Sequence, residues 1–157
     1  MSGKTWSGGC QCGAVRFRVA SIADPSFCHC RMCQKAFAGP GAALIDVEGL
    51  VWTRGAPKHF QSSNIVRRGF CADCGTQLTF EAADGPSLAI ATFDEAHDIS
   101  PVLQLNRERR LPWADHIANV PRRTPEQIAA RAAHYAAIVS HQHPDHDTDV
   151  WPTESKS

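Results

Sequence analysis

The stretch Cys10-Gln11-Cys12-Gly13-Ala14-Val15-Arg16-Phe17-Arg18-Val19-Ala20 joins two features that decide the fold. Its first four residues place two thiols one residue apart and then a glycine. Its last seven residues alternate, with Val15, Phe17 and Val19 on one face and two arginines on the other, which is typical of a half-buried strand. The stretch therefore predicts a strand that begins at a cysteine turn.

Similar short segments follow along the chain, and Gly and Pro separate them. Many short strands with regular turn signals predict a mainly β fold built from short antiparallel strands. The expected strands cover residues 14–20, 42–47, 50–53, 59–61, 65–70, 77–81, 88–93 and 102–105.

The last part of the chain has a different pattern, so we expect the β domain to cover residues 1–121 and a helix to cover residues 122–140. Thr124 is a good N-cap, with Pro125 in the first turn and Gln127 placed for a capping box. An apolar stripe at helical spacing predicts that this helix docks on the domain or on a neighbouring subunit. The stripe consists of Ile128, Ala132, Tyr135 and Val139.

Composition excludes several classes of function. The chain has 157 residues, with 16 Lys and Arg against 16 Asp and Glu, so we expect no nucleic-acid partner. Its longest apolar run, residues 135–139, is far too short to span a bilayer, and its start lacks the apolar region of a secretory signal. We therefore expect a cytoplasmic protein without a membrane partner. Residues 141–157 hold four acids and one Lys, which predicts a flexible tail.

The seven cysteines fall into tight clusters: Cys10 and Cys12, then Cys28, Cys30 and Cys33, then Cys71 and Cys74. Their number is odd and no secretory signal precedes them, so a disulfide scaffold is a poor interpretation. Thiols one or two residues apart rarely bridge one another, but they can direct two thiolates at one cation. The clusters therefore predict metal ligation, with zinc as the expected ion.

Seven ligands divide into a closed site of four and an open site of three. Cys10-Gln11-Cys12-Gly13 and Cys71-Ala72-Asp73-Cys74-Gly75 each end in a glycine directly after the last thiol, as a sharp cysteine knuckle requires. We therefore assign Cys10, Cys12, Cys71 and Cys74 to one structural zinc. Cys28, Cys30 and Cys33 remain for a second, catalytic zinc with an open position. The competing pairing joins Cys30 and Cys33 to Cys71 and Cys74. It leaves the three other thiols, Cys10, Cys12 and Cys28, without a metal site.

A zinc held by three thiolates suits the binding of another thiolate better than the activation of water. The motifs of zinc deaminases and zinc proteases are absent from the sequence. The iron–sulfur spacings are absent as well. The pattern therefore indicates a thiol substrate. His29 is interpreted as a residue that orients the site or contacts the substrate rather than as a ligand.

Four motifs in this order resemble the glutathione-dependent formaldehyde-activating enzyme (Gfa) family, which is also known as the centromere-protein-V domain. They are GGCQCGAVRF, CHCRMCQKAFAG, FCADCGTQL and a late LPW, and they lie within residues 5–120. The resemblance implies an Mss4-like β-tent fold with a structural zinc at the four-cysteine set and a labile catalytic zinc at the three-cysteine set. It also implies a carbon–sulfur lyase activity similar to that of S-(hydroxymethyl)glutathione synthase, with glutathione and formaldehyde as substrates.

The sequence departs from the family pattern near the second zinc site. Gln34 precedes Lys35 where the family commonly has Arg-Lys, Gln104 stands where a His is frequent, and residues 106–110 are unusually charged. These departures make the fold a safer inference than the substrate.

Several cations and aromatic residues are further candidates. Lys35, which we include among the catalytic residues, and Arg31 flank the open site and can offset its negative charge. Arg67 and Arg68 are interpreted either as a carboxylate clamp or as a solvated strand face. The remaining candidates are Arg107, Arg109 and Arg110 as a carboxylate clamp, Trp113 as a pocket or core residue, and His141, His143 and His146 as tail residues.

Two functions of different class remain open. The first is a zinc-dependent carbon–sulfur lyase that adds a zinc-bound, glutathione-like thiol to formaldehyde or a small aldehyde, or runs the reverse reaction. The second is a non-enzymatic Mss4-like zinc module that binds a protein partner. An open coordination position favours the lyase, because a structural module gains nothing from it. The protein is expected to be a monomer or a homodimer.

Overall fold

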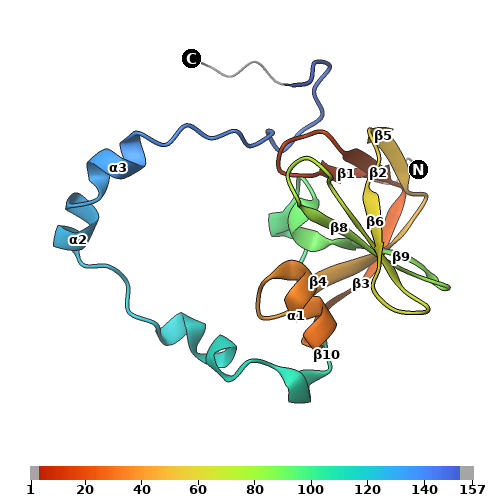
Figure 1. Cartoon of the computed structure of the whole chain (residues 1–157), viewed down its shortest axis with the longest axis horizontal. Helices are drawn as coiled ribbons and strands as arrows, with labels where there is room; N and C mark the ends of the chain where they lie inside the picture. Colours follow the sequence, from red (N-terminus) through yellow and green to blue (C-terminus); the bar gives the residue numbers. More distant parts are fainter. Residues whose placement is uncertain (1–3, 153–157) are drawn as a thin grey trace.

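The computed structural model describes residues 4–152 of the chain and has a mainly β architecture (Figure 1). A three-stranded sheet has the order β1-β2-β5, and a seven-stranded sheet has the order β10-β3-β4-β9-β8-β7-β6. The strands are β1 (Trp6–Gly9), β2 (Arg16–Val19), β3 (Ser21–Cys28), β4 (Ala42–Glu48), β5 (Val51–Arg54), β6 (Lys58–Gln61), β7 (Arg67–Phe70), β8 (Gln77–Ala82), β9 (Gly85–Ala89) and β10 (Leu103–Leu105).

The helices are short. They are α1 (Arg31–Phe37), α2 (Pro125–Ala129) and α3 (Ala132–Ala136), together with four 3-10 helices, η1 (Ile90–Thr92), η2 (Ala96–Asp98), η3 (Arg107–Arg109) and η4 (Pro112–Asn119). No helix within residues 4–152 is long and apolar enough to cross a membrane.

The main core lies between the two sheets. Phe17 and Val19 of β2 are buried against residues of β4 and β9, as the alternating pattern of this strand predicted. The core cluster consists of Phe17, Val19, Ile45, Val47, Leu88, Ile90, Phe93 and Ile99. The burial of these side chains from both sheets stabilises the domain through the hydrophobic effect.

Most of the expected strands are present, and the differences have physical reasons. The expected strand 88–93 ends at Ala89, where η1 begins. β10 pairs in parallel with β3, although the sequence predicted antiparallel strands. β1 was missed because its two glycines disfavour a strand. Gly8 is required there, since a Cβ on it would lie 2.2 Å from the Thr92 carbonyl oxygen.

The expectation of one continuous helix over residues 122–140 that docks on the domain is wrong, whereas docking on a neighbouring subunit stays a prediction. The capping box at Thr124 and Gln127 forms as predicted, but α2 ends at Ala129 and α3 begins at Ala132. Residues 115–142 are exposed throughout and form an arm that leaves the domain after β10 and loops away from it (Figure 1). Within residues 4–152 the apolar stripe packs on no surface of the domain, and packing is what sustains a long amphipathic helix in water.

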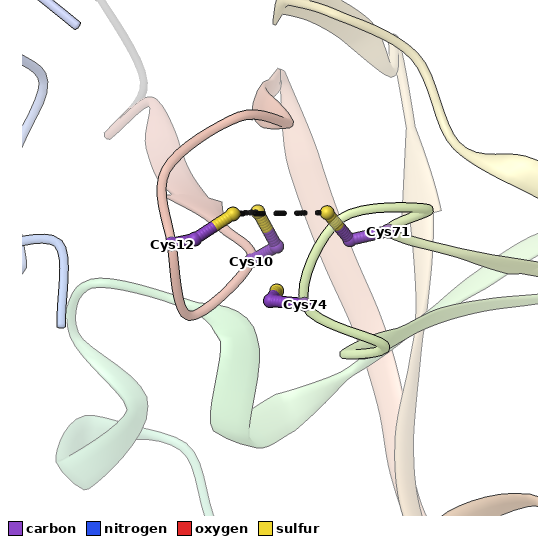
Figure 2. A group of neighbouring side chains, drawn as sticks. All are labelled: Cys10, Cys12, Cys71 and Cys74. Carbon is purple, nitrogen blue, oxygen red and sulfur yellow. Dashed lines mark hydrogen bonds between the residues drawn. The ribbon is translucent and has the colours of Figure 1, made fainter. Parts of the chain in front are cut away.

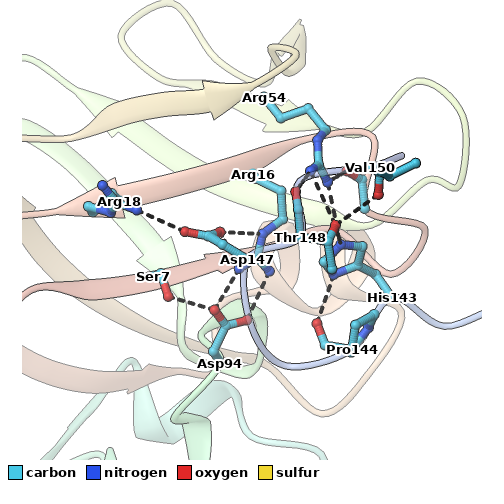
Figure 3. Close-up of polar contacts among 11 residues, drawn as sticks. Ser7, Arg16, Arg18, Arg54, Asp94, His143, Pro144, Asp147, Thr148 and Val150 are labelled. Atoms are coloured by element: carbon cyan, nitrogen blue, oxygen red, sulfur yellow. Dashed lines mark hydrogen bonds and ion pairs between the residues drawn. The ribbon is translucent and has the colours of Figure 1, made fainter. Parts of the chain in front are cut away.

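The expectation of a flexible tail is also wrong for the described residues of this tail. Residues 142–151, here called the C-terminal segment, return to the domain and lie against β2 and the first cysteine turn (Figure 3). His143 in this segment is buried. Residues 153–157 of the predicted tail lie outside the described part of the chain.

Two cysteine centres as candidate metal sites

Two turns bring four cysteine sulfurs together. Cys10 and Cys12 lie in the turn between β1 and β2, and Cys71 and Cys74 lie in the turn between β7 and β8 (Figure 2). The four sulfurs lie within 4.8 Å of one another, with 3.6 Å between Cys10 and Cys12 and 3.8 Å between Cys12 and Cys71. A tetrahedral zinc with Zn–S bonds of about 2.3 Å requires sulfurs about 3.8 Å apart. The donor set therefore fits a structural zinc.

Each turn is a knuckle that ends in a glycine with positive φ, as the sequence predicted. Gly13 has φ 81° and Gly75 has φ 76°, values that disfavour residues with a Cβ. The first turn directs the Val15 N–H to the Cys10 sulfur at 3.2 Å. In the second turn the Thr76 hydroxyl lies 3.2 Å from the Cys74 sulfur. These contacts orient the sulfurs toward one another.

Cys12 and Cys74 of this centre differ in acidity. Burial and the neighbouring thiols raise the pKa of Cys12 to about 12. Burial opposes ionisation of Cys74 as well, but hydrogen bonds from Thr76 outweigh it and lower the pKa of this thiol to about 6. One thiol is therefore ready to ionise at neutral pH, and a bound cation supplies the charge that ionises its neighbours.

The C-terminal segment covers the first knuckle. The His143 N–H donates to the Gln11 carbonyl at 2.8 Å, and the Trp151 indole N–H donates to the Cys12 carbonyl at 2.7 Å. Gly13 packs so closely on His143 that a Cβ at this position would lie 2.2 Å from the imidazole ring. The C-terminal segment therefore holds the first knuckle in place.

A buried arginine anchors the same segment (Figure 3). The Arg16 guanidinium is 3% exposed and donates to Asp94 at 2.6 and 2.9 Å and to Asp147 at 2.8 Å. Arg18 also donates to Asp147, at 2.9 Å. The alternating pattern placed Arg16 on the exposed face of β2, where instead Asp94, together with Asp147 of the C-terminal segment, contacts its guanidinium.

The other three cysteines form a separate cluster within one short stretch. Cys28 ends β3, Cys30 is the N-cap of α1 and Cys33 lies in the first turn of this helix. Their sulfurs lie within 4.8 Å of one another. The structure groups the cysteines as four and three, so the alternative pairing of Cys30 and Cys33 with the later knuckle is wrong.

The three-cysteine cluster opens on a cavity of about 860 Å³, lined near the cluster by Arg68, Phe80 and Asn106. Within residues 4–152 no fourth His, Cys, Asp or Glu completes the cluster. Burial raises the pKa of Cys33 to about 12, against a hydrogen bond from Arg68 that lowers it. For Cys30, burial is outweighed by the backbone N–H of Cys33, which lowers the pKa of this thiol. Three soft donors beside a cavity fit a metal ion with one open position.

A family model described as "Glutathione-dependent formaldehyde-activating enzyme" matches residues 5–108, which include both cysteine sets. The chain belongs to this Gfa family. A solved structure described as that of a Rhodobacter sphaeroides protein shares the fold, with a TM-score of 0.50 and 24% sequence identity. The alignment covers 62% of this chain and 98% of the other. The mainly β prediction is confirmed, and the Mss4-like fold is consistent with this neighbour.

Gln34, Gln104 and Asn106 lie beside the three-cysteine centre. The Gln104 side chain is hydrogen-bonded to His29 Nε2 at 3.0 Å. Buried Gln34 donates to the His29 carbonyl at 2.8 Å and to the Arg109 carbonyl at 2.9 Å. Asn106 donates to the Cys28 sulfur at 3.4 Å. These residues form one polar wall that fixes the loop from β3 to α1.

The remaining candidates are placed as follows. Lys35 is exposed on α1 and lines an apolar groove with Met32 and Phe60, outside the cavity of the cysteines. Arg31 is exposed and donates to Gln34. Trp113 is exposed and therefore does not belong to the core. The other exposed candidates are Arg67, Arg107, Arg109, His141 and His146, and Arg110 is half-buried and pairs with Asp115 at 2.5 Å.

Two residues beside the cysteine centres were missed or misjudged from sequence. Arg68 is 3% exposed and lies 3.5 Å from the Cys33 sulfur. Alternation along β7 is a signal that separates it from Arg67, because consecutive strand residues face opposite sides of a sheet. Asn106 was noted only as part of a charged stretch.

Proposed function

We propose that this Gfa-family protein is a zinc-dependent carbon–sulfur lyase that joins a small thiol to formaldehyde or another small aldehyde, or runs the reverse reaction. The observation that carries the proposal is the contrast between two thiol clusters in one domain. Four sulfurs enclose the first centre, whereas three sulfurs and a cavity surround the second. Cavities of this size accept a small-molecule substrate.

In this proposal Cys28, Cys30 and Cys33 hold the second zinc ion. The ion supplies positive charge that keeps the substrate sulfur ionised near neutral pH. The helix α1 fixes Cys30 and Cys33 at one end of the cavity, and Asn106 orients Cys28 through its hydrogen bond. The cavity then confines the thiol and the aldehyde in one place, which lowers the entropic cost of their encounter.

The reaction forms one bond. The thiolate sulfur attacks the carbonyl carbon, the π electrons of the C=O bond move to the oxygen, and the oxygen takes up a proton to give a hemithioacetal. The thiol releases one proton on binding, so the overall addition consumes none. The reverse reaction removes the hydroxyl proton and breaks the same C–S bond.

Calorimetry of the zinc-loaded protein with glutathione and with S-methylglutathione tests the proposal. Glutathione should bind with release of a proton, and the methylated compound, which has no ionisable sulfur, should bind at least tenfold more weakly. Equal binding of the two compounds would exclude sulfur coordination. Failure of any small thiol to bind at millimolar concentration would favour the alternative of a non-enzymatic zinc module with a protein partner.

A further inference from the structure

Strand β7 carries two consecutive arginines with opposite environments. Arg67 points outward and pairs with Glu81 at 2.7 Å, with 56% of its side chain exposed. Arg68 points inward and is 3% exposed. The two residues have the same charge and adjacent positions but differ in burial. A comparison of the two therefore isolates the effect of a buried cation beside the cysteines.

The contacts of Arg68 lead to the three-cysteine centre. Its Nη2 lies 3.5 Å from the Cys33 sulfur, and its Nε donates to the Ser62 hydroxyl at 3.3 Å. The guanidinium lies 5.1 Å from the centre of the Phe80 ring. These contacts fix its plane at the wall of the cavity that the cysteines share.

The guanidinium lacks a full set of partners. Its Nη1 is buried and has no acceptor within the described residues. No carboxylate of residues 4–152 lies within 4.0 Å of it. A buried cation is costly unless an anion or an acceptor compensates it. The anions that can compensate Arg68 are the cysteine thiolates and an anionic ligand bound beside them.

Charge counting indicates the effect on the fourth ligand. Three thiolates and a divalent cation carry a net charge of −1, so a further thiolate must enter against a negative charge. The Arg68 guanidinium brings this sum to zero before the ligand enters. A neutral ligand has no such dependence on a nearby cation, because it adds no charge.

We propose that Arg68 is a positioning residue that makes the three-cysteine centre select an anionic sulfur over neutral ligands. This inference rests on the proposed function and deepens it, since it names the charge of the species that the site accepts. Exposed Lys35 contributes less, because water screens its charge and it lies outside the cavity. Arg67 contributes nothing, because Glu81 neutralises it on the other face of the sheet.

Ligand preference of the zinc-loaded protein tests this inference without measuring turnover. Calorimetry gives the dissociation constants of 2-mercaptoethanol and of imidazole at one neutral pH for the wild type and for Arg68→Gln, Arg67→Gln and Lys35→Gln. Removal of Arg68 should weaken thiol binding about 10- to 100-fold, as loss of a residue that supports metal ligands does. Imidazole binding should change by less than about threefold. Arg67→Gln should change neither value, and Lys35→Gln should weaken thiol binding by less than Arg68→Gln.

The outcomes separate the inference from the proposed function. Equal weakening of both ligands in Arg68→Gln would mean a structural role, and no change in either would remove Arg68 from the site; both results overturn the inference. A wild type that binds no thiol would overturn the proposed function itself. Arg68→Lys keeps the charge and should retain the preference for thiol. If Arg68→Lys loses the preference for thiol, charge is not the cause and the inference fails. This test remains valid if Arg68→Gln does not fold.

Discussion

The four-cysteine centre and the three-cysteine centre use the same ligand in different structural settings. The first joins turns whose cysteines are 59 residues apart, one beside the three-stranded sheet and one in the seven-stranded sheet. The second is built from six consecutive residues, 28–33, beside a cavity. A centre that closes a long loop contributes to folding, because it removes freedom from the unfolded chain. A centre made from one local segment leaves the fold nearly independent of its metal.

The largest expected effect separates the two centres directly. Cys74→Ser should leave most of the protein unfolded or insoluble at 25 °C, because structural zinc contributes on the order of 10 kcal/mol to small zinc domains. Cys30→Ser should remain folded and lose one of two zinc ions. Cys30 is the suitable choice because it is only half-buried, unlike Cys33. Metal analysis and thermal unfolding check both variants, and equal loss of folding would refute the contrast.

Deletion of residues 141–157 should destabilise the four-cysteine centre alone. The deletion removes buried His143, the carboxylate of Asp147 beside Arg16, and the hydrogen bond to the Cys12 carbonyl. Asp147 is partly exposed, so we expect a loss of about 2–3 kcal/mol, which lowers Tm by roughly 5–10 °C in a chain of this size. Chelators should also remove the first zinc faster and the second at an unchanged rate.

A matched pair of substitutions supports this test. Asp147→Asn should reproduce part of the loss, and Asp145→Asn should reproduce none, since no ion pair or hydrogen bond of the Asp145 side chain occurs within residues 4–152. An unchanged Tm after the deletion would mean that the docked segment stabilises nothing.

The sequence predicted the cysteine grouping because the signal is local. A glycine directly after a cysteine pair predicts the positive φ of a knuckle, and both Gly13 and Gly75 have a positive φ. The docked C-terminal segment was missed because its partners are remote: Asp147 pairs with Arg16, 131 residues away, and nothing near either residue reveals this. The strand β3 was missed because Asp24 and Pro25 interrupt its pattern, and the register shifts at that point between Ala23 and Ser26.

The polar wall of the three-cysteine centre was only partly predictable. The sequence singled out Gln34, Gln104 and the charged stretch 106–110, and Gln34, Gln104 and Asn106 do lie beside this centre. Their contacts depend on the parallel pairing of β10 with β3, a non-local event that short apolar strands do not reveal. Arg68 was visible in principle, because the alternation of a strand requires one of two adjacent arginines to face inward.

Two glycines offer a finer comparison within the closed centre. Gly13 and Gly75 have nearly the same φ, but a Cβ at Gly13 would meet His143, whereas a Cβ at Gly75 meets nothing within 4 Å. Gly75→Ala should therefore cost about 1 kcal/mol for the backbone strain alone. Gly13→Ala should cost about 1–2 kcal/mol more, because the C-terminal segment must shift. Denaturant unfolding measures both, and the extra cost should vanish when residues 141–157 are absent.

Acidification should release the C-terminal segment from the domain. Burial, with nearby Arg16 and Arg54, lowers the pKa of His143 below its ordinary value of 6.5. The detached segment therefore binds more protons than the docked one as pH falls below about 6.5, and docking weakens. Burial opposes the ionisation of Asp147, but the hydrogen bonds from Arg16 and Arg18 outweigh it and lower the pKa of this carboxyl. Its contribution is thus lost only below about pH 4.

Hydrogen exchange of residues 142–151 between pH 7.5 and 5.5, corrected for intrinsic rates, measures this release. Protection should fall as the pH decreases. His143→Gln, which cannot become protonated, should show weaker docking that no longer depends on pH in this range. Protection that stays constant in the wild type would mean that His143 does not control the segment.

The smallest effect is expected in the arm that connects the two centres. It lies in the chain between Asn106, which contacts Cys28, and His143, which covers the first knuckle, and residues 115–142 are exposed throughout. Ile128→Ser and Tyr135→Ser remove exposed apolar side chains and should each change the free energy of unfolding by less than about 0.5 kcal/mol. Zinc content and thiol affinity should also be unchanged. A shift of thiol affinity at the three-cysteine centre would instead mean that the arm packs in solution and couples the two centres. Sedimentation at several protein concentrations would then show whether the arm packs on a second copy of the chain.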